Sequence, residues 1–171
     1  IQDAPSQLQM LFSLSNSNEL LFADYVLLTE GKTEWRVLPA LFERITGQSF
    51  ALIKCALVRQ GGVSNTRKSM QVLDAMDMPV RSIVDLDYAF TTATRDGFLE
   101  ANEPDIKMCR NLFRELAFHN HLRLVNGLPV NKHSNISASK AYAMMAAMPE
   151  ADKPIRSIHA KMRRHGIRVG E

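Results

Sequence analysis

The feature that most limits the fold is an alternation between short apolar segments and longer segments with helical periodicity. Residues 25–29, 50–58 and 80–84 are short and apolar, as expected for strands buried in a sheet. The segments between them, 33–47 and 64–76, place apolar residues three and four positions apart, as helices do. Strands separated by helices imply right-handed crossovers. The sequence therefore predicts an α/β fold with a mainly parallel sheet flanked by helices.

The remaining segments are mostly helical in pattern. Residues 7–21 predict a pair of short lead-in helices, and helical spacing returns over 106–118, 139–148 and 155–165, before a last strand at 167–169. We therefore expect the following organisation: lead-in helices over 1–22, an α/β core over 23–90, a helical extension over 91–165 and a last strand within 166–171.

Composition excludes several classes of protein. The 171 residues, 46% of them apolar, suffice for a globular core. The sequence shows neither a membrane-length apolar run nor a signal segment, so we expect a soluble, cytoplasmic protein. Cys55 and Cys109 lack metal-site spacing and are predicted to be small core residues in a reducing compartment. Because the chain begins with Ile1, we expect it to be a piece of a longer protein.

The net charge of +3 conceals an asymmetry between the two parts of the chain. Residues 1–104 contain nine Lys and Arg against 13 Asp and Glu, whereas residues 105–171 contain 12 against five. A basic segment of this kind favours a polyanionic partner, although a solvated surface can show the same imbalance.

Two acidic motifs are predicted to follow the first and third strands. Glu30 comes directly after the first strand and Glu34 lies four residues on, while Asp85 and Asp87 are predicted to end the third strand on one side of the chain. Ligands of open α/β sheets bind at the carboxyl ends of the strands. Because like charges repel, a divalent cation is expected there, and oxygen ligands without His or Cys suit Mg²⁺ or Mn²⁺. Such a site suits phosphodiester chemistry.

The motifs LLTEGKTE at residues 27–34 and IVDLD at 83–87 resemble a Toprim domain, the metal-binding module of topoisomerases, DnaG-type primases and several nucleases. The residues FAD at 22–24, LPAL at 38–41 and Gly61-Gly62 before Ser64 and Asn65 are similar to the OLD (overcoming lysogenization defect) family of nucleases.

This resemblance implies a two-metal DNA endonuclease domain behind an ABC-type ATPase domain, with a homodimer through that ATPase domain. It implies catalytic roles for Glu30 and Asp85 and a metal site of Glu30, Glu34, Asp85 and Asp87. This chain lacks the motif GxxxxGK[ST], so no ATP site is expected in it. Family members continue past the last strand into a further acidic segment, so a complete second metal site depends on residues near Glu171.

Several basic and polar residues are predicted to contact DNA phosphates. Helix-opening residues Ser64, Asn65 and Thr66 suit either a phosphate or simple capping. The basic segment near the C-terminus could lie along a phosphate backbone, with little sequence specificity, or could be a solvated helix face. The predicted DNA contacts are Lys32, Gly61, Gly62, Ser64, Arg156, Lys161, Arg163 and Arg164.

Two alternatives to DNA cleavage remain open at this point. One is another Toprim activity, such as RNA processing or primase-type nucleotidyl transfer. The other is a Toprim module without catalysis that serves in DNA binding or dimerisation. Retention of all four carboxylates favours an enzyme, because a scaffold has no need to hold that repulsion together.

Overall fold

The computed structural model describes residues 17–60 and 65–170. They divide into two compact units, one formed by residues up to Val84 together with Gly166–Gly170 and the other by Asp85–His165. The elements, in chain order, are η1 (Ser17–Phe22), β1 (Tyr25–Thr29), α2 (Lys32–Thr46), β2 (Cys55–Arg59), α3 (Thr66–Asp74), β3 (Val80–Val84), α4 (Leu86–Thr91), α5 (Pro104–Asn120), β4 (Leu124–Val125), β5 (Leu128–Pro129), α6 (Ala138–Ala146), α7 (Pro149–Arg164) and β6 (Ile167–Val169).

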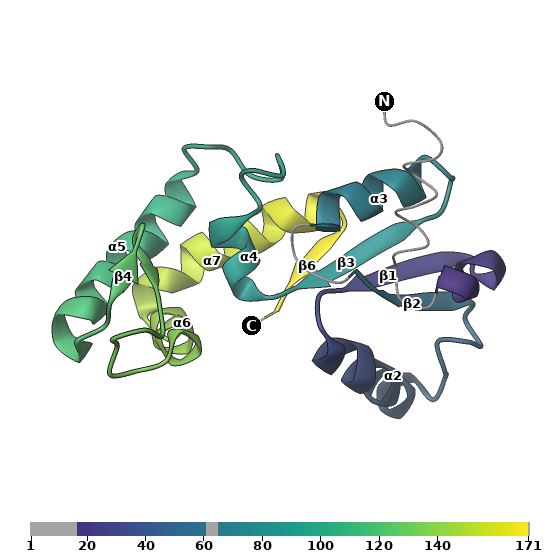
Figure 1. Cartoon of the computed structure of the whole chain (residues 1–171), viewed down its shortest axis with the longest axis horizontal. Coiled ribbons are helices and arrows are strands. Elements are labelled where there is room, and N and C mark those ends of the chain that lie inside the picture. Colours follow the sequence, from purple (N-terminus) through teal and green to yellow (C-terminus); the bar gives the residue numbers. More distant parts are fainter. Residues whose placement is uncertain (1–16, 61–64, 171) are drawn as a thin grey trace. The chain divides into compact units, whose positions relative to one another are not determined.

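The first unit is built on a four-stranded parallel sheet with the order β2-β1-β3-β6. The α3 helix covers one face and α2 lies on the other (Figure 1). Side chains alternate across a strand, so every second strand residue points toward α3. The buried core on that side consists of Val26, Leu28, Ala56, Val58, Leu73 and Val80.

The strands at 25–29, 80–84 and 167–169 lie where the sequence predicted them. The predicted helix after the first strand is α2, and Gly47 ends it with φ 70°, the left-handed conformation that glycine adopts readily. The mainly parallel sheet flanked by helices is confirmed.

Two boundary predictions in the first unit were wrong. The second strand begins at Cys55 rather than at residue 50, because residues 50–54 form turns in which Ser49 accepts a hydrogen bond from the Leu52 N–H. The following helix ends at Asp74 rather than Met76, before a turn with Asp77 at φ 57°. In the lead-in region, residues 17–22 form a 3-10 helix, and the rest of the predicted pair lies outside the described residues.

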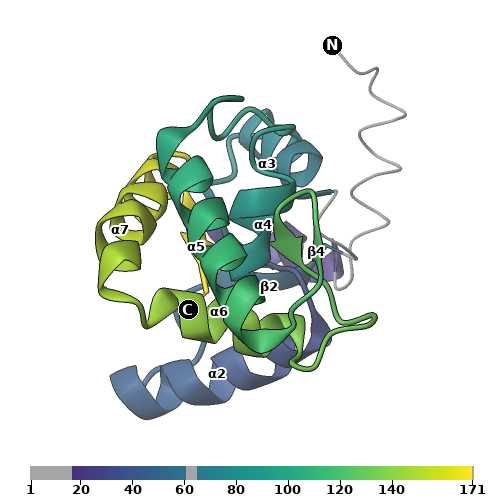
Figure 2. The same cartoon turned by 90° about the vertical axis from the view of Figure 1, so that its left-hand side faces the viewer.

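The second unit is mainly helical, and α5 packs along α7 and against α6 (Figure 2). The β4–β5 hairpin, which the sequence analysis missed, connects through Asn126 (φ 52°) and Gly127 (φ 76°). Positive φ at both positions defines a type I′ turn, for which Asn-Gly is the preferred sequence. Among the described residues, none of the helices is both long and apolar enough to cross a membrane.

Candidate functional site

The acidic motif after β1 is part of the start of helix α2. Glu30 follows the strand and is half-buried, and Gly31 is the N-cap residue of α2. The carboxylate of Glu34 turns back, and its Oε2 accepts a hydrogen bond from the Gly31 N–H at 2.9 Å. A Cβ on residue 31 would lie 2.7 Å from this oxygen, so the close approach depends on glycine. The carboxylate also lies in the first helical turn, where the helix dipole favours a negative charge.

The acidic motif after β3 is arranged differently from the prediction. The strand ends at Val84, Asp85 is the N-cap residue of α4, and Asp87 lies in the first turn of that helix. Both side chains are exposed. Alternation along a strand therefore does not apply to them, because the chain has already turned into a helix, where successive residues are about 100° apart. The prediction that this pair ends the strand was wrong.

The β1 and β3 strands are neighbours and run in parallel, with Thr29 in register with Ile83. The chain therefore leaves both strands at the same edge of the sheet, at Glu30 and at Asp85. Within the part of the chain that the structure describes, no group of three or more His, Cys, Asp or Glu side chains is arranged to hold a metal ion. The structure thus does not itself gather the four predicted carboxylates into one centre.

The end of β2 contains a buried polar residue that sequence reasoning missed. Gln60 is 2% exposed, and its Nε2 donates a hydrogen bond to Oγ1 of Thr66, the first residue of α3, at 2.8 Å. Its N–H donates to the Thr29 carbonyl and its own carbonyl accepts from Asn65 Nδ2. Gln60 therefore ties the N-terminus of α3 to the ends of β1 and β2. A polar residue directly after an apolar strand was the available signal.

Helix α4 is anchored by a buried hydrogen bond just after the second acidic motif. Tyr88 is fully buried, and its hydroxyl donates to Oδ2 of Asp96 at 2.8 Å. Asp87 lies on the same helix. Burial, and to a smaller extent the charge of Asp87, raises the pKa of Tyr142, while the charge of Arg110 lowers it. The second motif therefore begins a short helix whose orientation is held by buried side chains.

The predicted DNA contacts have different surroundings in the structure. Lys32 is exposed at the first position of α2, and Asn65 is the N-cap residue of α3. The ammonium of Lys161 contacts two carboxylates, Glu103 at 2.5 Å and Asp105 at 2.9 Å. Gly61, Gly62, Ser64 and Glu171 lie outside the described residues.

The three other predicted DNA contacts on α7 are exposed: Arg156, Arg163 and Arg164. Arg156 donates from Nε to Asp152 Oδ1 at 2.7 Å, one helical turn earlier. Because this pair is exposed to solvent, it contributes little to stability.

The Lys161 cluster joins α5 to α7. Glu103 is 4% exposed, and Ser157 donates a further hydrogen bond to Asp105. The hydrogen bond to Glu103, followed by the one to Asp105, raises the pKa of Lys161. Burial raises the pKa of Asp105, but hydrogen bonds from Ser157 and Lys161 and the lysine charge outweigh it, so the net shift is downward. The cluster therefore acts as a partly buried ion pair between two helices.

The two cysteines lack the features of reactive thiols. Burial raises the pKa of Cys55 and raises that of Cys109 to about 11. At neutral pH both are therefore protonated, and the thiol, unlike the thiolate, is a poor nucleophile and metal ligand. Cys109 is fully buried in the second unit, in agreement with the prediction of a small core residue.

A parallel sheet flanked by helices, with acidic motifs directly after two neighbouring strands, is the arrangement of a Toprim domain. Residues 21–87 match the family described as overcoming lysogenization defect protein-like, TOPRIM domain. This segment is therefore similar to an OLD-like Toprim domain, as its motifs predicted.

Two individual proteins are also similar to this chain. The chain is 28% identical over 173 residues to the Old nuclease of Escherichia phage P2. The alignment covers 95% of this chain but 28% of that protein, so the chain spans little more than a quarter of its relative. A solved structure of the C-terminal region of the Xanthomonas campestris pv. campestris OLD protein is 16% identical, with a TM-score of 0.42, 90% of this chain covered and 52% of the other.

Proposed function

We propose that this chain is a metal-dependent DNA endonuclease domain, which hydrolyses phosphodiester bonds with Mg²⁺ or Mn²⁺. The observation that carries the proposal is the exit of the chain at Glu30 and Asp85 from two adjacent parallel strands of an OLD-like Toprim domain. The similarity to a protein named Old nuclease supports the same activity.

The donor set fits such metal ions. Glu30, Glu34, Asp85 and Asp87 offer hard carboxylate oxygens, the ligand type that Mg²⁺ and Mn²⁺ prefer, and we propose these four as the metal ligands. Divalent cations held by these carboxylates would supply Lewis acidity and would stabilise negative charge that develops on the leaving oxygen. Glu34 is already positioned through its hydrogen bond to Gly31.

In the proposed reaction, Glu30 and Asp85 are the catalytic residues. The oxygen of a water molecule attacks phosphorus, and the bond from phosphorus to one bridging oxygen breaks. That oxygen takes up a proton from solvent, so a phosphate monoester and an alcohol result. Glu30, half-buried after β1, accepts the proton of the attacking water as general base. Asp85, held at the start of α4, acts as a metal ligand.

The test is cleavage of supercoiled plasmid DNA by the whole chain with Mn²⁺ or Mg²⁺. We expect nicking that stops on addition of EDTA, and Asp85→Asn should lower the rate by about 100-fold or more because it removes charge at constant size. Asp74→Asn, an exposed acid at the end of α3, is the matched control and should retain activity. Full activity in EDTA, or an active Asp85→Asn, would contradict the proposal.

Further substrates separate this proposal from the other Toprim activities. Labelled RNA tests RNA processing, and nucleoside triphosphates on a single-stranded template test primase-type transfer. We expect DNA cleavage to dominate. We also propose that the domain works in a longer protein beside an ABC-type ATPase domain, so ATP should leave cleavage by this chain alone unchanged. The cytoplasmic location and the homodimer through the ATPase domain remain predictions.

A further inference from the structure

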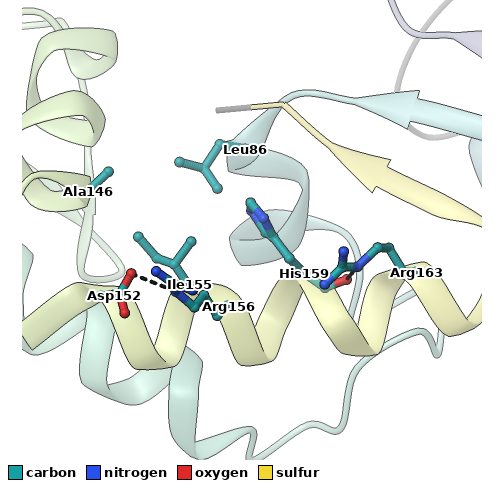
Figure 3. Close-up of a pocket in the computed structure, with 7 residues that line it drawn as sticks. All are labelled: Leu86, Ala146, Asp152, Ile155, Arg156, His159 and Arg163. Carbon is teal, nitrogen blue, oxygen red and sulfur yellow. Dashed lines mark hydrogen bonds and ion pairs between the residues drawn. The ribbon is translucent and has the colours of Figure 1, made fainter.

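The second unit contains a cavity of about 510 Å³ beside the start of α4, a volume within the range of sites for small ligands. Figure 3 shows its lining residues. Leu86, Ala146 and Ile155 form an apolar part of the wall. Because Leu86 stands between Asp85 and Asp87 in the sequence, the cavity adjoins the second acidic motif.

The polar part of the wall comes from one face of helix α7. Arg156, His159 and Arg163 are spaced three and four residues apart, and all three line the cavity. At 1.5 Å per residue they extend over about 10 Å along the helix axis. The side chain of His159 extends from α7 toward Leu86 (Figure 3). The lining of the cavity therefore combines basic side chains of α7 with apolar side chains.

Both arginines donate a hydrogen bond through Nε. Arg156 donates its Nε–H to Asp152, and Arg163 donates its Nε–H to the backbone carbonyl of His159 at 3.3 Å. These bonds orient the planar guanidinium groups and leave their terminal amino groups, with four further N–H donors on each, for another partner. Paired N–H groups of this geometry match the oxygens of a phosphate.

We propose that this cavity binds one phosphate group of a DNA strand through Arg156, His159 and Arg163, with the attached sugar against Leu86 and Ile155. This inference rests on the proposed function, since it supplies the place where the substrate strand is held next to the second acidic motif. It adds His159 to the binding residues and removes Lys161, whose ammonium contacts Glu103 and Asp105.

Charge supports this choice of ligand. Asp152 also lines the cavity, and its carboxylate opposes an anion, but it is paired with Arg156 and is outweighed by the two arginines. A neutral ligand could only accept hydrogen bonds from the two guanidinium groups, whereas a phosphate offers both acceptor oxygens and negative charge.

The test measures binding of a fluorescent single-stranded oligonucleotide to the whole chain by anisotropy, in EDTA, so that the readout does not depend on the metal site. We expect Arg156→Gln and Arg163→Gln each to weaken binding about tenfold. Each should also reduce the slope of log affinity against log salt by about one. His159→Phe keeps a ring but removes both nitrogens, and we expect a loss of a few-fold.

Lys153→Gln is the matched control, because it removes one charge from an exposed position of the same helix outside the cavity. We expect it to bind within twofold of the unmodified chain. Equal losses for Lys153→Gln and Arg163→Gln would overturn the proposal, since they would show a diffuse charge effect. Unchanged binding by the double variant Arg156→Gln/Arg163→Gln would also overturn it. Melting temperatures of all variants check that folding is retained.

A small-ligand competition supplies a second measurement. Thymidine 5′-monophosphate should displace the oligonucleotide at lower concentration than thymidine, and Arg163→Gln should abolish that difference. Equal competition by nucleotide and nucleoside would contradict a phosphate site. The binding measurements do not include cleavage, so failure of the nuclease proposal would appear in the plasmid assay alone. It would appear there as undiminished cleavage by Asp85→Asn or as full activity in EDTA.

Discussion

The carboxylate of Glu34 accepts a hydrogen bond from the Gly31 N–H, so one of the proposed metal ligands also caps the helix that carries it. This relationship couples the local stability of α2 to the position of a carboxylate. A polar residue three positions after the N-cap commonly makes this contact. The EGKTE motif can therefore be tested both as a helix start and as part of a metal site.

Gly31→Ala separates these two roles when it is compared with Glu34→Gln. The alanine Cβ would meet Glu34 Oε2 at 2.7 Å and displace it, so we expect a loss of about 1 kcal/mol in the free energy of unfolding and weaker Mn²⁺ binding. Glu34→Gln retains an acceptor for the Gly31 N–H, so it should remain stable while losing metal affinity. Urea unfolding and calorimetry measure the two quantities. Equal stability of Gly31→Ala and the unmodified chain would show that the cap contributes nothing.

Metal binding should stabilise the folded chain. Because a ligand of the native state shifts the unfolding equilibrium, Mn²⁺ at about ten times its Kd should add about 1.4 kcal/mol to the free energy of unfolding. We expect Asp85→Asn to lose most of this gain and Asp74→Asn to keep it. Thermal unfolding in EDTA and in Mn²⁺ provides the comparison, and a gain that is identical in both variants would remove Asp85 from the metal site.

Tyr88→Phe should destabilise the second unit. It removes the hydroxyl that donates to Asp96, so a carboxylate that is only 7% exposed loses a hydrogen bond. We expect the free energy of unfolding to fall by about 1–3 kcal/mol. The control is Tyr142→Phe, since the Tyr142 ring packs against Phe113 and Phe90 and is retained in phenylalanine. We expect little change in that variant. The midpoints of urea unfolding measure both, and a Tyr88→Phe midpoint equal to that of the control would show that this hydrogen bond is not needed.

Lys161→Met should destabilise the chain by about 2 kcal/mol at neutral pH, because it leaves the buried carboxylate of Glu103 without its ammonium partner. Arg156→Met breaks an exposed pair and should change stability by less than about 0.5 kcal/mol.

The effect of Lys161→Met should also depend on pH. The pKa of Asp105 is lowered in the folded chain, so its contribution is present above its unfolded pKa of about 3.9 and is lost as pH falls through the folded value. The pKa of Lys161 is raised, so its contribution is full below about pH 10.4 and is lost as pH rises through the folded value. The difference between the unmodified chain and Lys161→Met should therefore be largest between about pH 5 and 10. A pH-independent difference would contradict this assignment.

Local sequence was sufficient for the elements whose pattern is strong over a short range. The apolar strands at 25–29 and 80–84 and the Gly47 end of α2 follow from periodicity and from the conformation of glycine. The β4–β5 hairpin could also have been predicted, because Asn126-Gly127 between apolar residues favours a type I′ turn. The start of the second strand was missed because the apolar pattern continues through residues 50–54, which form turns that include the hydrogen bond from the Leu52 N–H to Ser49.

By itself the sequence predicted the class of domain and the four candidate metal ligands, because the two acidic motifs stand at fixed positions after apolar strands. The tertiary structure decided which side chains have partners. In the sequence, Lys161 is one member of a basic segment. In the structure, its ammonium is hydrogen-bonded to Glu103 and Asp105, which lie more than 50 positions earlier in the chain. His159 gained its place in the cavity from the packing around α7. Such contacts join segments remote in sequence, and periodicity describes only neighbours along the chain.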